Sequence, residues 1–122
     1  MLKILTWNIN KGGSLQRINS IGQQINKHSA DIVLLSEYWC GDKGVELQKQ
    51  LSEYGYDYIV TSNGQPKQNH LLFASRYPFD VIPSSYQREK NKERWLEIKL
   101  IQQDLHILGI HIPTSQDNKT FG

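Results

Sequence analysis

Apolar residues follow two different spacings in the first part of the chain. Residues 2–10 and 30–38 hold short, nearly continuous apolar runs, which are typical of buried strands. Between them, apolar residues recur every three or four positions, which predicts a helix with Ser14 as its N-cap. These residues are Leu15, Ile18, Ile21 and Ile25. The pattern therefore predicts a β-α-β unit.

The helical spacing appears once more and then gives way to strands. Leu47, Leu51 and Tyr54 share one face of a second predicted helix, which Gly55 ends. Short β-like runs follow at residues 56–61, 71–75, 81–85, 94–101 and 105–112. We expect one domain with an α/β or α+β layered sheet, in which the β-α-β unit continues as an antiparallel meander.

Polar residues stand at the ends of three of these strands. Asn8 closes the first strand, Glu37 the second, and His111 lies near the end of the last. Parallel strands joined by a crossover helix end at one sheet edge, so Asn8 and Glu37 are expected to be neighbours. A carboxylate after an apolar run is costly to bury unless it is paired or binds a metal. The pair therefore predicts half of a metal-dependent, phosphoester-cleaving site, which His111 joins if its strand runs in the right direction.

Each of these residues also has a structural interpretation. Asn8 can end its strand by bonding to its own backbone, and Glu37 can mark the return of the chain to water. A strand-end histidine such as His111 is often bonded to a backbone carbonyl. Ser75 and Arg76 close another apolar run, where an arginine can clamp a phosphate or belong to a turn. From the residues alone, these alternatives stay open.

Other motifs favour structural roles. The Gly12-Gly13-Ser14 segment lacks the spacing of a Walker loop, so we expect a turn followed by a helix cap. The three tryptophans are expected to be core or rim aromatics rather than base-stacking platforms. They are Trp7, Trp39 and Trp95.

Composition limits the class of protein, its partners and its cellular compartment. The chain has 122 residues, 38% of them hydrophobic and 21% charged, as in an ordinary globular domain. The formal charge of +2 does not by itself indicate a nucleic-acid partner, and the charged residues 88–94 are expected to form a solvated loop. Cys40 is the only cysteine, which favours a reducing compartment. No signal peptide or membrane-spanning apolar run is found in the sequence, so a cytoplasmic location is expected.

Four segments in order carry a family resemblance. Residues 5–10, 31–37, 72–79 and 109–113 resemble the endonuclease/exonuclease/phosphatase family, which includes deoxyribonuclease I and exonuclease III. The resemblance implies a four-layer α/β/β/α sandwich that hydrolyses phosphate esters with a divalent metal, usually Mg²⁺, with Mn²⁺ as an alternative. It also implies roles for five residues. Glu37 and Asn8 would be metal ligands, Asn8 and His111 would be catalytic, and Ser75 and Arg76 would bind phosphate.

The chain also departs from the family pattern. Family members continue into a second half that supplies an Asp-x-Asn motif, a further aspartate and an Asp-His pair. We find none of these in the sequence, and Asp117-Asn118 follows no apolar strand, so we do not accept it as the motif. Residues 1–122 are therefore expected to form a single partial domain, with helices on one face and with the C-terminal half and one sheet of the sandwich absent. Such a chain would be inactive or incomplete, and its exposed sheet face would favour self-association.

The leading hypothesis is a metal-dependent hydrolase of phosphate esters. A nuclease-like phosphodiesterase, with DNA among its candidate substrates, is preferred because residues 75–78 and 109–113 resemble exonuclease III-like members. One alternative is a phosphatase or a sphingomyelinase-like phosphodiesterase. Another is a non-catalytic truncated remnant or binding module of the same fold, and the least favoured is an unrelated α/β ligand-binding domain.

Overall fold

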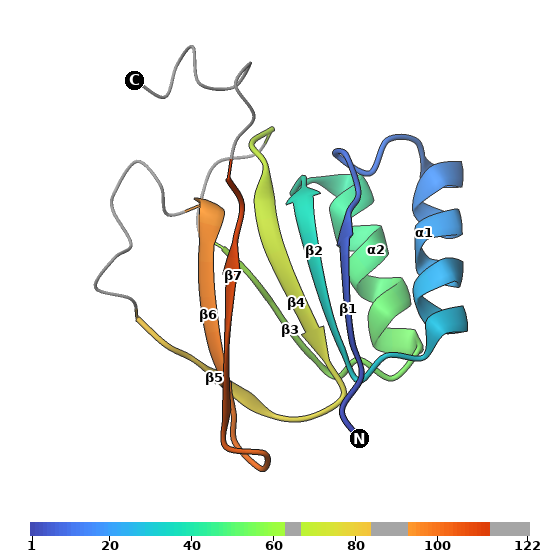
Figure 1. The fold of residues 1–122 in the computed structure, drawn as a ribbon. Helices are drawn as coiled ribbons and strands as arrows, with labels where there is room; N and C mark the ends of the chain where they lie inside the picture. Colours follow the sequence, from blue (N-terminus) through green and yellow to red (C-terminus); the bar gives the residue numbers. More distant parts are fainter. Residues whose placement is uncertain (63–66, 84–92, 113–122) are drawn as a thin grey trace, which may run out of the picture.

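Three layers form the domain in a computed structural model, which describes residues 1–62, 67–83 and 93–112. Two helices cover one face of a four-stranded sheet, and a three-stranded sheet covers its other face (Figure 1). The elements in chain order are β1 (Ile4–Asn8), α1 (Leu15–His28), β2 (Ile32–Tyr38), α2 (Asp42–Glu53), β3 (Tyr58–Thr61), β4 (His70–Ser75), β5 (Phe79–Val81), β6 (Trp95–Leu100) and β7 (Leu105–Ile110).

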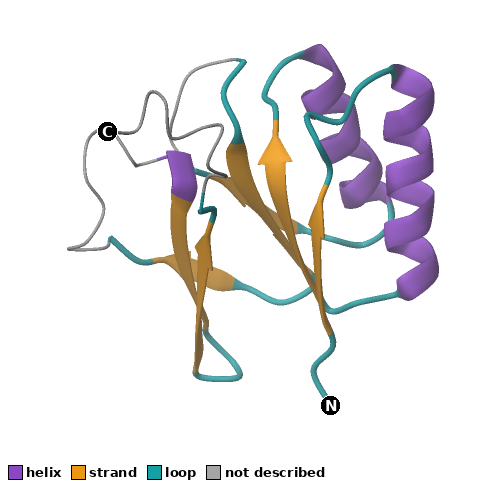
Figure 2. Ribbon diagram, turned by 45° about the horizontal axis from the view of Figure 1, so that its top comes forward, coloured by secondary structure: helices purple, strands orange, loops and turns teal. Residues whose placement is uncertain are grey.

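The two helices form where the apolar spacing predicts them. Ser14 is the N-cap of α1, and its hydroxyl accepts a hydrogen bond from the Arg17 backbone N–H at 3.2 Å. Helix α1 ends at Ser29, which adopts a left-handed conformation, and α2 is followed by Gly55 at φ +98°. Both helices lie side by side on the same face of the first sheet (Figure 2). In the part of the chain that is described, neither helix is long and apolar enough to cross a membrane.

The first sheet has the strand order β1-β2-β4-β3. Strands β1 and β2 are parallel, whereas β4 runs antiparallel to both β2 and β3. Every residue of β4 is buried, because the helices cover one of its faces and the second sheet the other. The expected β-α-β unit is therefore present, and the ends of β1 and β2 lie at one edge of the sheet.

The second sheet corrects one expectation from the sequence. Strands β5, β6 and β7 form an antiparallel sheet that packs on the first through an apolar cluster. Its buried members are Ile32, Leu71, Phe73, Leu96, Ile98 and Leu100. The expectation that one sheet would be absent is wrong, because the late strands do not form one meander. Strands β3 and β4 join the first sheet, while β5 begins the second.

Strand ends differ from the expected ones by a few residues. Strand β5 ends at Val81, and β7 ends at Ile110 rather than at residue 112. Several predicted features lie outside the described residues. They are positions 84–85, most of the charged segment 88–94, and Asp117-Asn118.

Candidate active site

An irregularity at the end of β2 aims Glu37 at Asn8. Val33 and Leu35 face the helices, and simple alternation would send Glu37 to the same side. The register with β4 shifts between Leu35 and Tyr38, and Glu37 adopts φ +53°. Tyr38 then occupies the helix-side core in place of Glu37. A left-handed conformation costs a non-glycine residue about 1–2 kcal/mol, so the fold holds this carboxylate in place against backbone strain.

The side chains of Asn8 and Glu37 are in direct contact. Asn8 Nδ2 donates a hydrogen bond to Glu37 Oε2 at 2.5 Å, and Asn8 Oδ1 accepts one from the Asn10 backbone N–H at 3.0 Å. The loop after β1 is tied to the same place, because the Lys11 backbone N–H donates to the Glu37 carbonyl at 2.8 Å. These bonds fix both side chains at the sheet edge, where the sequence placed them.

The two sheets meet just below this pair. Gly109 of β7 lies against Leu34 of β2, since a Cβ on the glycine would be 3.1 Å from Leu34 Cδ1. That Cβ would also lie 3.4 Å from the Leu96 carbonyl oxygen of β6. Residues two positions further along each strand lie on the same face, about 7 Å nearer the edge. Leu34, Leu96 and Gly109 therefore form an apolar level beneath the next residues on those strands.

The next level is polar on both sheets. Two residues beyond Leu34 on β2 is Ser36, which pairs with Asn8 in the parallel ladder. On the second sheet, Arg94 lies two residues before Leu96, and His111 lies two residues after Gly109. The His111 backbone N–H donates to the Arg94 carbonyl at 3.0 Å. Figure 1 shows that β1, β2 and β7 end on the same side of the sandwich. His111 is thus brought to the edge that carries Asn8 and Glu37.

A cavity of about 500 Å³ opens between these strand ends. Asn8 and Ser36 line it from the first sheet, and Leu108 and Ile110 line it from β7. Its other lining residues are Thr6, Trp7, Leu34 and Leu71. This cavity gives a ligand access to the Asn8–Glu37 pair from the space between the strand ends.

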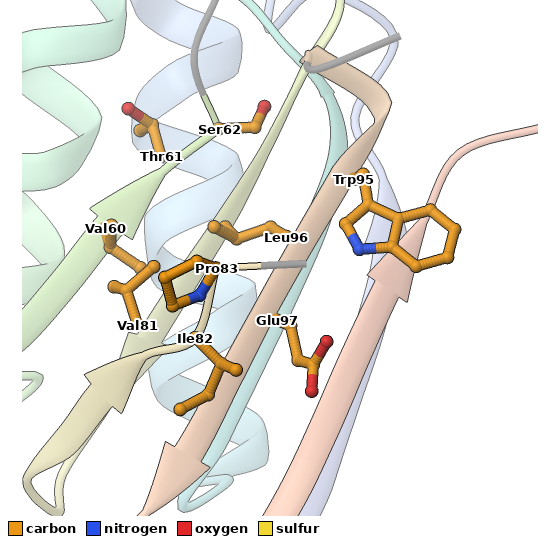
Figure 3. Close-up of a pocket in the computed structure, with 9 residues that line it drawn as sticks. All are labelled: Val60, Thr61, Ser62, Val81, Ile82, Pro83, Trp95, Leu96 and Glu97. Atoms are coloured by element: carbon orange, nitrogen blue, oxygen red, sulfur yellow. The ribbon is translucent and has the colours of Figure 1, made fainter. Parts of the chain in front are cut away.

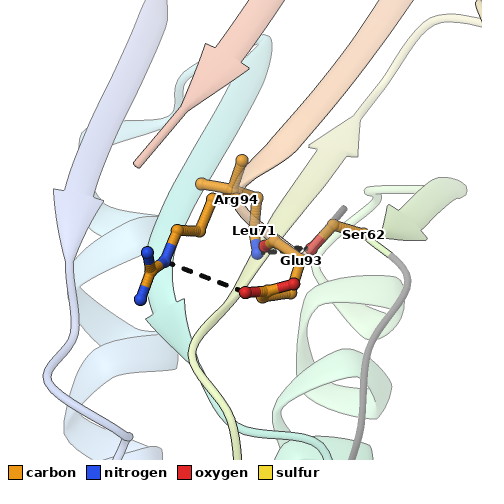
Figure 4. Close-up of polar contacts among 4 residues, drawn as sticks. All are labelled: Ser62, Leu71, Glu93 and Arg94. Carbon is orange, nitrogen blue, oxygen red and sulfur yellow. Dashed lines mark hydrogen bonds and ion pairs between the residues drawn. The ribbon is translucent and has the colours of Figure 1, made fainter. Parts of the chain in front are cut away.

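Arg94 is a candidate site residue that the sequence reasoning missed. Its Nε lies 3.9 Å from Glu93 Oε1, and only 24% of its side chain is exposed. Figure 4 shows its guanidinium directed away from Ser62. Leu96 and Ile98 both face the core, and side chains two residues apart on a strand share a face. Arg94, two residues before Leu96, is therefore expected on the core face as well. The charged residues around it concealed this signal and led us to expect a solvated loop.

A buried serine holds the start of β6 in place. Ser62 Oγ donates to the Glu93 carbonyl at 2.7 Å and accepts from the Leu71 backbone N–H at 3.0 Å (Figure 4). His70 Nδ1 lies 3.1 Å from the Ser62 carbonyl oxygen and donates to it. Because Ser62 links the first sheet to Glu93, it also fixes the backbone of the adjacent Arg94.

Ser75 and Arg76 lie at the opposite edge of the sheet. Strand β4 is antiparallel to β2, so Ser75 pairs with Ile32 at the start of β2 rather than with its end. Arg76 donates to the carbonyls of Ala30 at 3.2 Å and Tyr54 at 2.9 Å. The phosphate-binding role of Ser75 and Arg76 was expected from the family resemblance, and it remains a prediction. Because both residues lie at the opposite edge, we leave them out of the candidate site.

A separate cavity of about 300 Å³ lies between β3 and β6 (Figure 3). Val60 and Leu96 face each other across it, whereas the side chains of Trp95 and Glu97 leave the other face of β6. Its walls are mainly aliphatic, and it does not form part of the candidate site.

The oxygen donors of the pair suit a hard divalent cation. Glu37 offers a carboxylate and Asn8 an amide oxygen, whereas no group of three His, Cys, Asp or Glu occurs in the described ranges. Mg²⁺ prefers oxygen ligands and often keeps several waters while bound by one or two carboxylates. The Glu37 carboxylate therefore fits part of the coordination shell of such an ion. The Asn8 oxygen reaches the same ion only if its amide turns, because Nδ2 faces Glu37 and Oδ1 accepts from the Asn10 N–H.

The fold and the site together define a layered α/β protein with a pair of oxygen donors at the carboxyl ends of two parallel strands. The profile of the Endonuclease/Exonuclease/phosphatase family matches residues 5–110, and the chain belongs to this family. The family resemblance drawn from four short segments is thereby confirmed. No curated protein matches the chain in a sequence search.

Solved structures support the same fold. An AP endonuclease from Archaeoglobus fulgidus is 22% identical, with a TM-score of 0.71 over 93% of this chain and 42% of its own. A truncated Caenorhabditis elegans TDP2 is 20% identical, with a TM-score of 0.69 over 97% and 49%. The 3′ phosphatase NExo from Neisseria, bound to a product DNA hairpin, is 19% identical, with a TM-score of 0.71 over 91% and 41%. The chain thus spans less than half of each of these proteins, and the predicted deoxyribonuclease I-like fold class is confirmed.

Proposed function

We propose that this chain carries part of the active site of a metal-dependent hydrolase of phosphate esters. The observation that carries the proposal is the Asn8–Glu37 pair, which the strained backbone of Glu37 creates at the edge of the sheet. An oxygen-donor pair held against backbone strain is typical of a binding site.

In this proposal each residue of the polar level has a separate role in binding the metal or the phosphate. Glu37 and Asn8 hold the divalent cation, with Mg²⁺ preferred and Mn²⁺ as the alternative. When bound there, such a cation would supply Lewis-acid polarisation of a phosphoryl oxygen and stabilisation of the charge that develops on it. His111 donates a hydrogen bond to the phosphate, and Arg94 supplies a charge-assisted contact to the same group. The two sheets thus approach the phosphate from opposite sides.

Nucleic acid is the substrate that we favour. Two of the structural neighbours are an AP endonuclease and a phosphatase bound to a DNA hairpin. These likenesses are distant, so they support a nuclease-like phosphodiesterase without excluding a phosphatase or a sphingomyelinase-like enzyme. We further propose that the group that activates water lies outside the described residues, so that the isolated chain binds metal but turns over little. A cytoplasmic location is proposed on the strength of the single Cys40.

Metal binding tests this proposal directly. Mn²⁺ titration followed by electron paramagnetic resonance should detect one site in the chain, and Glu37→Gln should weaken it by more than ~10-fold. Glu53→Gln is the matched control, because Glu53 is an exposed carboxylate at the end of α2. Absence of a bound ion, or equal effects of the two variants, would favour the non-catalytic binding module. Robust metal-dependent cleavage of DNA that Glu37→Ala abolishes would instead show that no further group is needed.

A further inference from the structure

A second hollow lies beside the candidate site, on the side of the loops that follow β1 and β2. This cavity has a volume of about 450 Å³. Its lining residues are Lys11, Gly13, Trp39, Cys40, Gly41, Asp42, Lys43, Gly44 and Lys67. Both loops are attached to the metal-binding pair, because the Lys11 N–H bonds to the Glu37 carbonyl and Trp39 follows Glu37 by two residues. A ligand in this hollow would therefore lie next to a phosphate held at Glu37.

Positive charge is concentrated around this hollow. Lys11, Lys43 and Lys67 line it with exposed side chains, and Asp42 is the one acidic residue among the lining residues. The local balance of +2 equals the formal charge of the whole chain. A cationic surface of this kind attracts phosphates, and the overall charge alone does not reveal it.

Trp39 provides a flat aromatic wall between the lysines. Its Nε1 donates to Asn69 Oδ1 at 2.7 Å, and Lys11 Nζ lies over one face of the ring, 5.0 Å from the centroid, so a base would stack on the other face or displace this ammonium. Gly44 lies directly beneath the Trp39 backbone, where there is no room for a larger side chain. The indole is therefore held in a fixed place and is only partly buried. A fixed aromatic ring beside cations is the usual platform for an unpaired base.

We propose that this hollow binds an unpaired nucleotide of the substrate, adjacent to the phosphate at the Asn8–Glu37 pair. The base stacks on Trp39, and Lys43 and Lys67 contact the flanking phosphates. This inference rests on the proposed function, which it extends by naming single-stranded nucleic acid as the substrate class. A lipid headgroup presents one compact charge and no flat ring, so it matches the spread of lysines around an indole less well.

Binding without metal tests this site separately from catalysis. The 122-residue chain is titrated with a 5′-fluorescein-labelled hexathymidylate in EDTA, and fluorescence anisotropy is recorded at several salt concentrations. Trp39→Leu should weaken binding at least ~5-fold, whereas Trp39→Phe keeps a ring and should retain most of the affinity. Lys43→Ala with Lys67→Ala should weaken binding and reduce the slope of log affinity against log salt by ~1.4.

Matched controls separate this site from general effects of charge. Lys27→Ala with Lys49→Ala removes two exposed lysines from the helices and should leave the salt slope nearly unchanged. Circular dichroism confirms that each variant is folded, and a Glu53→Gln chain should bind the oligonucleotide normally in EDTA. If the wild-type chain binds the oligonucleotide but binds no Mn²⁺, the proposed function alone is refuted. The nucleotide site is refuted if the wild-type chain does not bind the oligonucleotide, or if the two double-lysine variants have the same affinity and salt slope. It is also refuted if the chain binds phosphatidylserine vesicles instead of the oligonucleotide.

Discussion

The side chain of Leu34 lies against the backbone of Gly109, and this contact brings the two sheets together just below the candidate site. Gly109→Val should lower the free energy of unfolding by about 1–3 kcal/mol, because the new side chain overpacks the space against Leu34 and the Leu96 carbonyl. Urea unfolding measures the change. Leu34→Ala should partly rescue the valine variant, since it removes the atoms that the valine meets. Additive effects of the two substitutions would contradict this contact.

The backbone of Glu37 yields a prediction that separates stability from function. Glu37→Gly and Glu37→Ala both remove the carboxylate, so both should lose the Mn²⁺ site. Only glycine tolerates φ +53° without strain, so the glycine variant should be about 1 kcal/mol more stable than the alanine variant. Thermal unfolding of the two variants checks this difference. Equal stability, or a more stable alanine variant, would show that Glu37 does not hold this conformation in solution.

The sequence was sufficient for the β-α-β unit and for the meeting of Asn8 and Glu37. Both follow from local rules, namely apolar spacing and the parallel crossover, and these rules act before tertiary packing is known. The direction of the Glu37 side chain was not predictable, because the bulge in β2 depends on how β2 pairs with β4. Alternation alone would have sent this side chain toward the helices.

Local rules did not predict the positions of three other residues, namely Ser75, Arg76 and Arg94. The direction of β4 is set by its pairing with β2, which periodicity does not encode, so the sequence did not show that Ser75 and Arg76 lie at the edge opposite Asn8 and Glu37. The split of the late strands into two sheets also depends on long-range pairing. Arg94 was recoverable from the alternation of β6, but local charge density argued against it.

Arg76 and Arg94 are therefore expected to respond differently to substitution. Arg76→Lys should cost about 1–3 kcal/mol of unfolding free energy, because a lysine cannot reach the carbonyls of Ala30 and Tyr54 together. It should leave oligonucleotide binding in Mn²⁺ unchanged. Arg94→Lys should weaken that binding several-fold, because a compact ammonium lacks the two-pronged contact of a guanidinium with phosphate. Anisotropy and urea unfolding distinguish the two, and the reverse pattern would return Arg76 to the site.

Tyr38 is expected to make the fold sensitive to alkaline pH. Burial raises the pKa of Tyr38 to about 12, although the hydrogen bond from Gln48 opposes this shift. Tyrosine in the unfolded chain has a pKa of about 10, so it loses its proton first. Its stabilising contribution is therefore complete below pH ~10 and is lost as the pH rises toward ~12. Between pH ~9 and ~11.5, unfolding free energy should fall less in Tyr38→Phe than in wild type, and Tyr58→Phe serves as the exposed control.

The outer face of the second sheet should promote self-association. Leu108 and Ile110 pair with Glu97 and Trp95 on that face and also border the cavity next to Asn8. Their exposed fractions are 43% and 45%, and no helix in the described ranges covers them. Strand β7 is also an edge strand, whose unpaired backbone groups can bind a further strand. Sedimentation velocity should therefore detect concentration-dependent association that Leu108→Lys reduces. Val45→Lys is the matched control, because Val45 is 65% exposed on α2, away from this face. A chain that stays monomeric at ~100 μM, or that responds equally to both lysines, would show that this face does not drive association.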